Sequence, residues 1–83
     1  MLEIRFFARF REQLGTDRLQ LAWHEGLTQV ADVTELLAAR GPEWRATLCA
    51  ERVIVAVNHA VVEGGETLRD GDEVAYFPPV TGG

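Results

Sequence analysis

One amphipathic helix is the feature of this sequence that most limits the folds open to the chain. From residue 28 or 29 to Arg40, apolar residues recur with the helical period and polar residues fall between them. The apolar side is formed by Val30, Val33, Leu36 and Leu37. Because strand-like segments lie before and after this helix, its apolar side is expected to cover one face of a single mixed sheet.

Two strand-like segments precede the helix. Residues 2–8 alternate, so one face is predicted to carry Leu2, Ile4, Phe6 and Ala8, and the other Glu3, Arg5, Phe7 and Arg9. Residues 19–23 alternate again, with Leu19, Leu21 and Trp23 inward. A helical turn over residues 10–14, ended by Gly15, is expected between them. The two strands are predicted to pair as a hairpin-like unit.

The remaining chain predicts a short helix and three strands. Gly41 and Pro42 suit the end of one helix and the start of another, in which Trp44 and Leu48 lie four apart. Residues 53–57 read as a strand buried on both faces, and turns at 58–59 and 70–72 separate strands at 60–63 and 73–77.

This order of elements predicts an α+β fold of the β-grasp type, with one main helix packed on one face of a mixed sheet. A ferredoxin-like sandwich fits less well, because it needs a second full helix between the later strands. A small barrel also fits less well, because it does not need the apolar stripe of the helix.

The length and net charge of the chain limit its number of domains and its possible binding partners. Eighty-three residues make one domain, here residues 1–77, followed by an extended tail at residues 78–83. The composition, 47% hydrophobic and 25% charged, is that of a folded protein. A net charge of −5 opposes binding to nucleic acid and to anionic membrane surfaces.

The reactive side chains point away from independent catalysis. Cys49 is the only cysteine and, with His24 and His59, forms no metal-ligand spacing or disulfide. Cys49 is predicted to be a buried structural thiol and both histidines ordinary surface residues. The chain has no serine or lysine, which excludes those nucleophiles. With no long apolar run and a strand directly after Met1, a cytoplasmic location is expected.

The uncovered face of the sheet is predicted to carry an apolar docking patch. Phe7 and Phe77 share the alternation of charged residues on that face, and Val61 is expected to join them. Arg5, Arg9 and Arg11 would supply a charged rim. Isolated exposed hydrophobic residues also occur without a partner, so a plain solvated face is the alternative.

The tail Phe77-Pro78-Pro79-Val80-Thr81-Gly82-Gly83 is the most informative segment. The prolines end the sheet, and six extended residues span about 20 Å. Glycine has no Cβ to obstruct a narrow channel, so this thread can present its terminal carboxylate to a partner's cleft. A carboxylate is a poor electrophile, so chemistry there requires activation, most economically adenylation by a partner enzyme with Mg-ATP. The protein would then be a substrate.

Several segments resemble the small, sulfur-carrying subunits of molybdopterin synthase, a ubiquitin-like family. They are 6–8, 11–12, 15–17, 56–58 and 68–75, together with the Phe-Pro-Pro-Val-Thr-Gly-Gly tail. The resemblance covers essentially the whole chain. It implies that Gly83 is adenylated by a ubiquitin-activating-enzyme-like adenylyltransferase and converted to a thiocarboxylate with sulfur from a donor. The thiocarboxylate would then donate sulfur to cyclic pyranopterin monophosphate.

The resemblance also implies partners and site residues. A large synthase subunit would receive the tail in a heterotetramer, and ATP would be used by the adenylyltransferase, with no cofactor bound permanently to this chain. Gly82 and Gly83 match the reactive end. The positions expected to contact partners are Phe7, Arg11, Val61, Phe77, Pro78, Pro79, Val80 and Thr81.

Three other functions stay open. The chain could be a protein modifier conjugated through Gly83 to amines of other proteins. It could carry sulfur for another pathway, such as thiamine synthesis or tRNA thiolation. It could also be a β-grasp interaction module in which the terminal glycines have no role.

Overall fold

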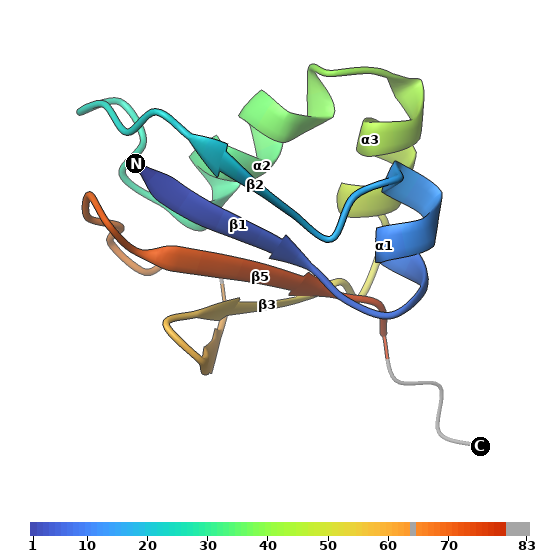
Figure 1. Ribbon diagram of the computed structural model, residues 1–83. Helices are drawn as coiled ribbons and strands as arrows, with labels where there is room; N and C mark the ends of the chain where they lie inside the picture. Colours follow the sequence, from blue (N-terminus) through green and yellow to red (C-terminus); the bar gives the residue numbers. More distant parts are fainter. Residues whose placement is uncertain (64, 80–83) are drawn as a thin grey trace.

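The computed structural model describes residues 1–63 and 65–79. Its elements follow the predicted order, and the helical turn after the first strand is a short helix (Figure 1). They are β1 (Leu2–Phe6), α1 (Arg9–Leu14), β2 (Arg18–Leu21), α2 (Val30–Ala38), α3 (Pro42–Leu48), β3 (Ile54–Val57), β4 (Ala60–Val62) and β5 (Glu73–Phe77).

The five strands form one mixed sheet in the order β2-β1-β5-β3-β4. The first and last strands, β1 and β5, lie side by side in parallel, with Ile4 opposite Val74, and the other pairs are antiparallel. The hairpin-like pairing of the first two strands is thus confirmed. The helices gather on one side of this sheet and leave the other side open (Figure 1). This is the predicted β-grasp arrangement.

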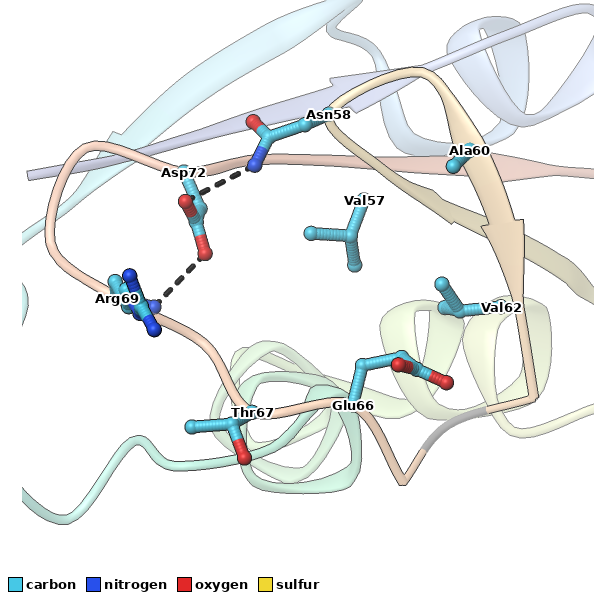
Figure 2. A pocket seen from close by; sticks show the side chains of 8 residues that line it. All are labelled: Val57, Asn58, Ala60, Val62, Glu66, Thr67, Arg69 and Asp72. Atoms are coloured by element: carbon cyan, nitrogen blue, oxygen red, sulfur yellow. Dashed lines mark hydrogen bonds between the residues drawn. The ribbon is translucent and has the colours of Figure 1, made fainter.

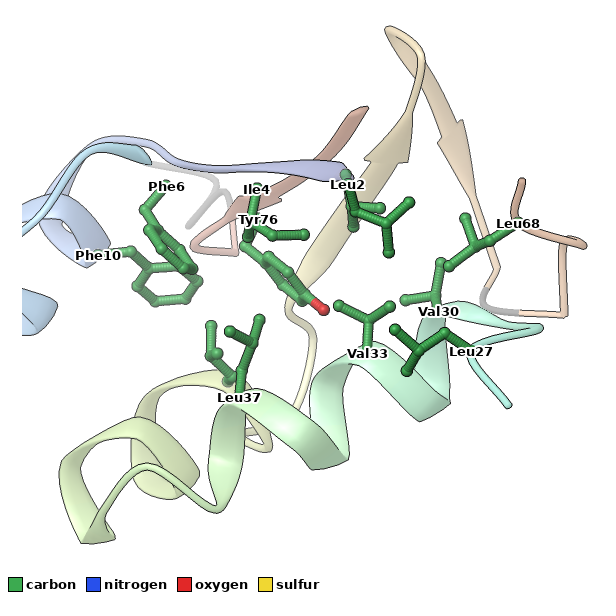
Figure 3. Close-up of a cluster of buried hydrophobic side chains, with 12 residues drawn as sticks. Leu2, Ile4, Phe6, Phe10, Leu27, Val30, Val33, Leu37, Leu68 and Tyr76 are labelled. Atoms are coloured by element: carbon green, nitrogen blue, oxygen red, sulfur yellow. The ribbon is translucent and has the colours of Figure 1, made fainter. Parts of the chain in front are cut away.

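The buried core lies between the sheet and the helices (Figure 3). Its members from the sheet include Leu2, Ile4 and Phe6, and α2 contributes Val33 and Leu37. The inward set predicted for the first strand is confirmed for these three residues, since each is at most 1% exposed.

Tyr76 joins β5 to α2 across this core. Its hydroxyl lies 2.7 Å from the Thr34 hydroxyl, and its ring stacks on Phe6 with centroids 5.9 Å apart. Burial raises the pKa of Tyr76 to about 12, partly offset by the hydrogen bond to Thr34. The phenol is therefore held neutral inside the core.

Asp32 fixes the start of α2. Its carboxylate accepts hydrogen bonds from the backbone N–H groups of Gln29 and Thr28, at 3.0 and 3.1 Å, and from the Thr28 hydroxyl. The Gln29 and Thr28 bonds lower the pKa of Asp32, because they favour the charged form. A carboxylate in the first turn also satisfies backbone donors that have no partner within the helix.

Two predicted turns are tied together beside β5 (Figure 2). Asn58 and His59 both adopt positive φ, 49° and 72°, in the β3–β4 turn. The Asn58 amide donates to Asp72 at 3.0 Å and its oxygen accepts from the Glu73 N–H, also at 3.0 Å. The other Asp72 oxygen accepts from the Arg69 N–H at 2.8 Å. These hydrogen bonds join Asn58, Arg69 and Asp72, which are among the residues that line a hollow of about 400 Å³ between these segments.

Three details of the prediction are wrong. Leu36 is 42% exposed, because its neighbour Leu37 takes the position that faces the sheet. Ala8 lies after β1 with φ 54°, at the point where the chain turns into α1. In the strand predicted to be buried on both faces, Ala56 alone is buried, and it lies on the open face beside Ala75. Val55 and Val57, on the core side, are only half-buried, because β3 is separated from the edge of the sheet by β4 alone.

The prediction for Cys49 is also wrong, because the thiol is exposed. Cys49 follows the last residue of α3, and the neighbouring Leu48 occupies the inward position. His24 and His59 are exposed as predicted. Among the helices within residues 1–63 and 65–79, none has the length and apolar character to cross a bilayer.

Candidate functional site

The strand register places one row of side chains across the open face of the sheet. Leu2, Ile4 and Phe6 point into the core, so the intervening Arg5 points to the opposite side. From β2 to β4 the row reads Arg18, Arg5, Ala75, Ala56 and Val61. It therefore begins with two cations and ends with an apolar residue.

A second row contains the two phenylalanines predicted to lie on this face. The Phe7 N–H donates to the Tyr76 carbonyl at 3.1 Å, which extends the β1–β5 pairing, and Phe77 lies opposite Ile54. The rings of Phe7 and Phe77 stack with centroids 4.6 Å apart and planes 6° apart. The Arg5 guanidinium carbon lies 5.0 Å from the Phe7 centroid. Both rings are half-buried, and each ring covers one face of the other.

An apolar hollow of about 410 Å³ lies beside this stack. It is lined by Ala8, Ile54, Val61, Phe77, Pro78 and Pro79. Val61 forms its exposed wall, with 74% of its surface accessible. We call these residues together with Phe7 the docking face. A hollow of this kind can accept an apolar side chain of a partner, because no polar group would lose its hydration there.

The docking face lies where the tail leaves the sheet. β5 ends at Phe77, and Pro78 and Pro79 form part of the hollow's lining. Proline has no N–H to continue the ladder, which is why pairing ends at this point. A partner seated on the docking face would therefore lie next to the base of the tail.

The structure brings together five of the residues predicted to contact partners, namely Phe7, Val61, Phe77, Pro78 and Pro79. Arg11 is exposed on α1 and does not line the hollow. Val80, Thr81, Gly82 and Gly83 lie outside the described residues. The contact roles of all these residues remain predictions.

Ile54 and Ala8 belong to the docking face but were missed from the sequence. The signal for Ile54 was present, because it has the same alternation parity as Ala56, which pairs with Val61. This signal was not used, because residues 53–57 were interpreted as a strand buried on both faces, with no residue on an open face. Ala8 gave no such signal, since its position depends on the backbone turn after β1.

Comparison with known proteins shows a family match and relatives of similar length. The sequence profile of the ThiS family matches residues 4–83. Molybdopterin synthase sulfur carrier subunits of Haemophilus influenzae and Escherichia coli are 39% and 40% identical to this chain, each over 100% of both chains. Small archaeal modifier protein 3 of Haloferax volcanii is 33% identical, over 99% of this chain and 98% of its own.

Solved structures show the same fold. The solution structure of the HVO 2177 protein of Haloferax volcanii has a TM-score of 0.80 and 35% identity, covering 99% of this chain and 85% of that one. A chain from a Helicobacter pylori complex of subunits 1 and 2 of molybdopterin-converting factor has a TM-score of 0.69 and 20% identity. It covers 99% of this chain and 97% of that one.

Proposed function

This chain belongs to the ThiS family, and on that premise we propose that it is a sulfur carrier and the small subunit of molybdopterin synthase. The observation that carries the proposal is the position of the docking face at the base of the Gly-Gly tail. The full-length similarity to sulfur carrier subunits of that enzyme supports the same assignment.

The docking face and the tail have separate roles, partner binding and presentation of the C-terminus. Phe7, Phe77 and the hollow bind the partner through apolar contact, so the tail itself need not supply the affinity. Four residues follow Pro79, and an extended chain of that length spans at most about 14 Å. The two terminal glycines lack side chains that would obstruct a narrow cleft.

The chemistry takes place at the carboxylate of Gly83. An adenylyltransferase partner transfers AMP from ATP to this carboxylate and releases pyrophosphate. The terminal sulfur of a persulfide donor then displaces AMP and forms an acyl disulfide, which a thiol reduces to release the thiocarboxylate and a disulfide of the donor. The thiocarboxylate is the nucleophile toward cyclic pyranopterin monophosphate in the large subunit. Two carriers deliver the two dithiolene sulfurs of each molybdopterin, and a heterotetramer holds a carrier at each end of a large-subunit dimer.

The partner assignment has separate support. The Helicobacter pylori relative in fold was solved as a complex of the two subunits of its converting factor. This chain contains none of the serine or lysine nucleophiles of an independent enzyme, which agrees with a carrier that acts inside another protein's cleft in the cytoplasm.

A second candidate function is conjugation to other proteins through Gly83. It is favoured by the similarity to small archaeal modifier protein 3. In that case the activated carboxyl would be captured by an amine of a target instead of by a sulfur donor. Sulfur carriage for thiamine synthesis or tRNA thiolation would use the same thiocarboxylate with a different acceptor.

Mass spectrometry separates these functions. The chain is incubated with ATP, the adenylyltransferase and a sulfur donor from the same genome. Replacement of one oxygen by sulfur at Gly83 supports carriage, whereas high-mass adducts support conjugation. A Cys49→Ala variant is the matched control, because Cys49 is exposed and is the only thiol that a donor could persulfidate. The mass gain must persist in it.

Deletion of Gly82 and Gly83 tests the requirement for the tail. The truncated chain is expected to fold and to bind the large subunit, but to support no molybdopterin synthesis. If synthesis survives with the fold intact, the carrier function is wrong.

A further inference from the structure

Two arginines face each other at the edge of the docking face. Arg5 of β1 and Arg18 of β2 are direct cross-strand partners, and both point to the open side of the sheet. Directly opposite residues of an antiparallel pair have Cβ atoms about 4.5 to 5.5 Å apart, and like charges at that separation destabilise the sheet. A fold that keeps such a pair calls for an explanation.

No carboxylate within residues 1–63 and 65–79 forms an ion pair with either arginine. The ion pairs found there are the N-terminal amine with Asp70, Arg45 with Glu35, and His59 with Glu73. Glu3 shares the open face, but it accepts a hydrogen bond from Gln20 at 3.2 Å. The Nε of Arg5 is buried and has no hydrogen-bond partner in this part of the protein. The arginine pair is thus left without an ion-pair partner among these residues.

The charge of the chain is unevenly distributed. Residues 1–18 contain four of the eight arginines and three of the thirteen acidic residues. Residues 19–83 contain four arginines and ten acidic residues, so the N-terminal part is the cationic region of an acidic protein. This region carries the Arg5–Arg18 pair, and an acidic surface would complement it.

The pair is continuous with the aromatic part of the docking face. The Arg5 guanidinium lies over Phe7, which stacks on Phe77, and Phe77 lines the apolar hollow. A guanidinium on an aromatic ring is held in one orientation, and its planar edge can donate two hydrogen bonds to one carboxylate. Cation, ring and hollow therefore form a strip from β2 to β4.

We propose that Arg5 and Arg18 form a carboxylate-binding pair that selects the protein partner of the docking face. The occupant is a segment of the large synthase subunit that presents an aspartate or glutamate to the arginines and an apolar side chain to the hollow. The identity of that partner rests on the function proposed above. The carboxylate neutralises the repulsion between the arginines, so this part of the sheet is relieved of strain only in the complex.

Reversing one charge of the pair tests this role, because folding and binding should respond in opposite directions. Arg18→Glu places a carboxylate directly opposite Arg5, so the isolated chain should gain stability and show a higher Tm. The same variant should bind the large subunit about tenfold more weakly. Its new carboxylate would pair with Arg5 and would repel the carboxylate of the partner.

Arg45→Glu is the matched control. It makes the same change in net charge on α3, where Arg45 pairs with Glu35 at 3.3 Å. This helix lies on the side of the sheet away from the docking face (Figure 1). Its affinity for the large subunit should stay within about twofold of the wild type. The affinity of the wild-type chain should also fall more steeply with salt than that of Arg18→Glu.

Binding is measured by calorimetry with the large subunit encoded in the same genome. If Arg18→Glu binds within twofold of the wild type, or no more weakly than Arg45→Glu, the carboxylate-binding role is wrong. The sulfur-carrier function is not affected by that result, because wild-type binding and thiocarboxylate formation at Gly83 are measured separately.

Discussion

Replacing Phe77 by alanine is expected to damage partner binding more than folding. The Phe77 ring is half-buried, lies opposite Ile54 and stacks at 4.6 Å on Phe7 outside the helix-covered core. Its removal opens one wall of the hollow at the base of the tail. The ring therefore contributes mainly to the surface that a partner would cover.

The structure sets the size of both effects. Truncating a fully buried phenylalanine to alanine costs about 3 to 5 kcal/mol of the free energy of unfolding. Phe77 is only half-buried, so about 1 to 2 kcal/mol is expected, including the lost stack with Phe7. An aromatic residue at the centre of an interface typically contributes at least about 2 kcal/mol to binding. The dissociation constant for the large subunit should therefore rise about 30-fold or more.

A core variant with a similar cost of unfolding provides the control. Phe6 lies next to Phe7 in sequence but is 1% exposed, and it packs edge-on against Trp44 at 5.5 Å. Phe6→Leu should lower the free energy of unfolding by about 1 to 2 kcal/mol and leave binding within about twofold. Urea unfolding gives the first quantity for each variant, and calorimetry with the large subunit gives the second.

Two results would refute this reasoning. One is a loss of unfolding free energy for Phe77→Ala near that of a fully buried phenylalanine, which would place the ring in the core. The other is equal loss of binding in Phe77→Ala and Phe6→Leu, which would mean that binding follows stability alone.

Two further predictions concern the rest of the fold. Because burial raises the pKa of Tyr76 to about 12, stability should be complete below the ordinary tyrosine pKa near 10 and should fall by about 2 to 3 kcal/mol as the pH rises to 12. Tyr76→Phe should lack this loss, and since Tyr76 is the only tyrosine, tyrosinate absorbance that titrates near pH 10 in the folded chain would contradict the prediction. His59→Gly should raise the free energy of unfolding by about 0.5 to 1 kcal/mol, because His59 has φ 72° in the β3–β4 turn, where glycine is unstrained. An unchanged or lower Tm would show that its exposed contact with Glu73, at 3.6 Å, matters more than backbone strain.

The predicted elements were correct where the pattern in the chain is local. Alternation along residues 2–6 fixed which side chains face the core, and Gly15 and Pro42 marked where helices end or begin. These signals depend only on neighbours in the chain, because the backbone period decides the direction of each side chain. The patch formed by Phe7, Phe77 and Val61 followed from the same rule.

Two of the errors concern adjacent residues of which only one can face the core. Leu36 and Leu37 are equally apolar, and only the position of the sheet decides that Leu37 is buried and Leu36 exposed. Cys49 and Leu48 show the same competition at the end of α3. Local periodicity cannot resolve such pairs, since a helix turns by only about 100° between them.

The sequence by itself determined the strands, the main helix and the apolar parity of the open face, because each depends on residues close together in the chain. Only the tertiary structure placed β1 beside β5, and with it Phe7 against Phe77 and both rings next to the hollow. It also decided that Arg5 and Arg18 stand opposite each other. Pairings between distant segments depend on the register of the whole sheet, which is set by burying one continuous core and not by any single segment.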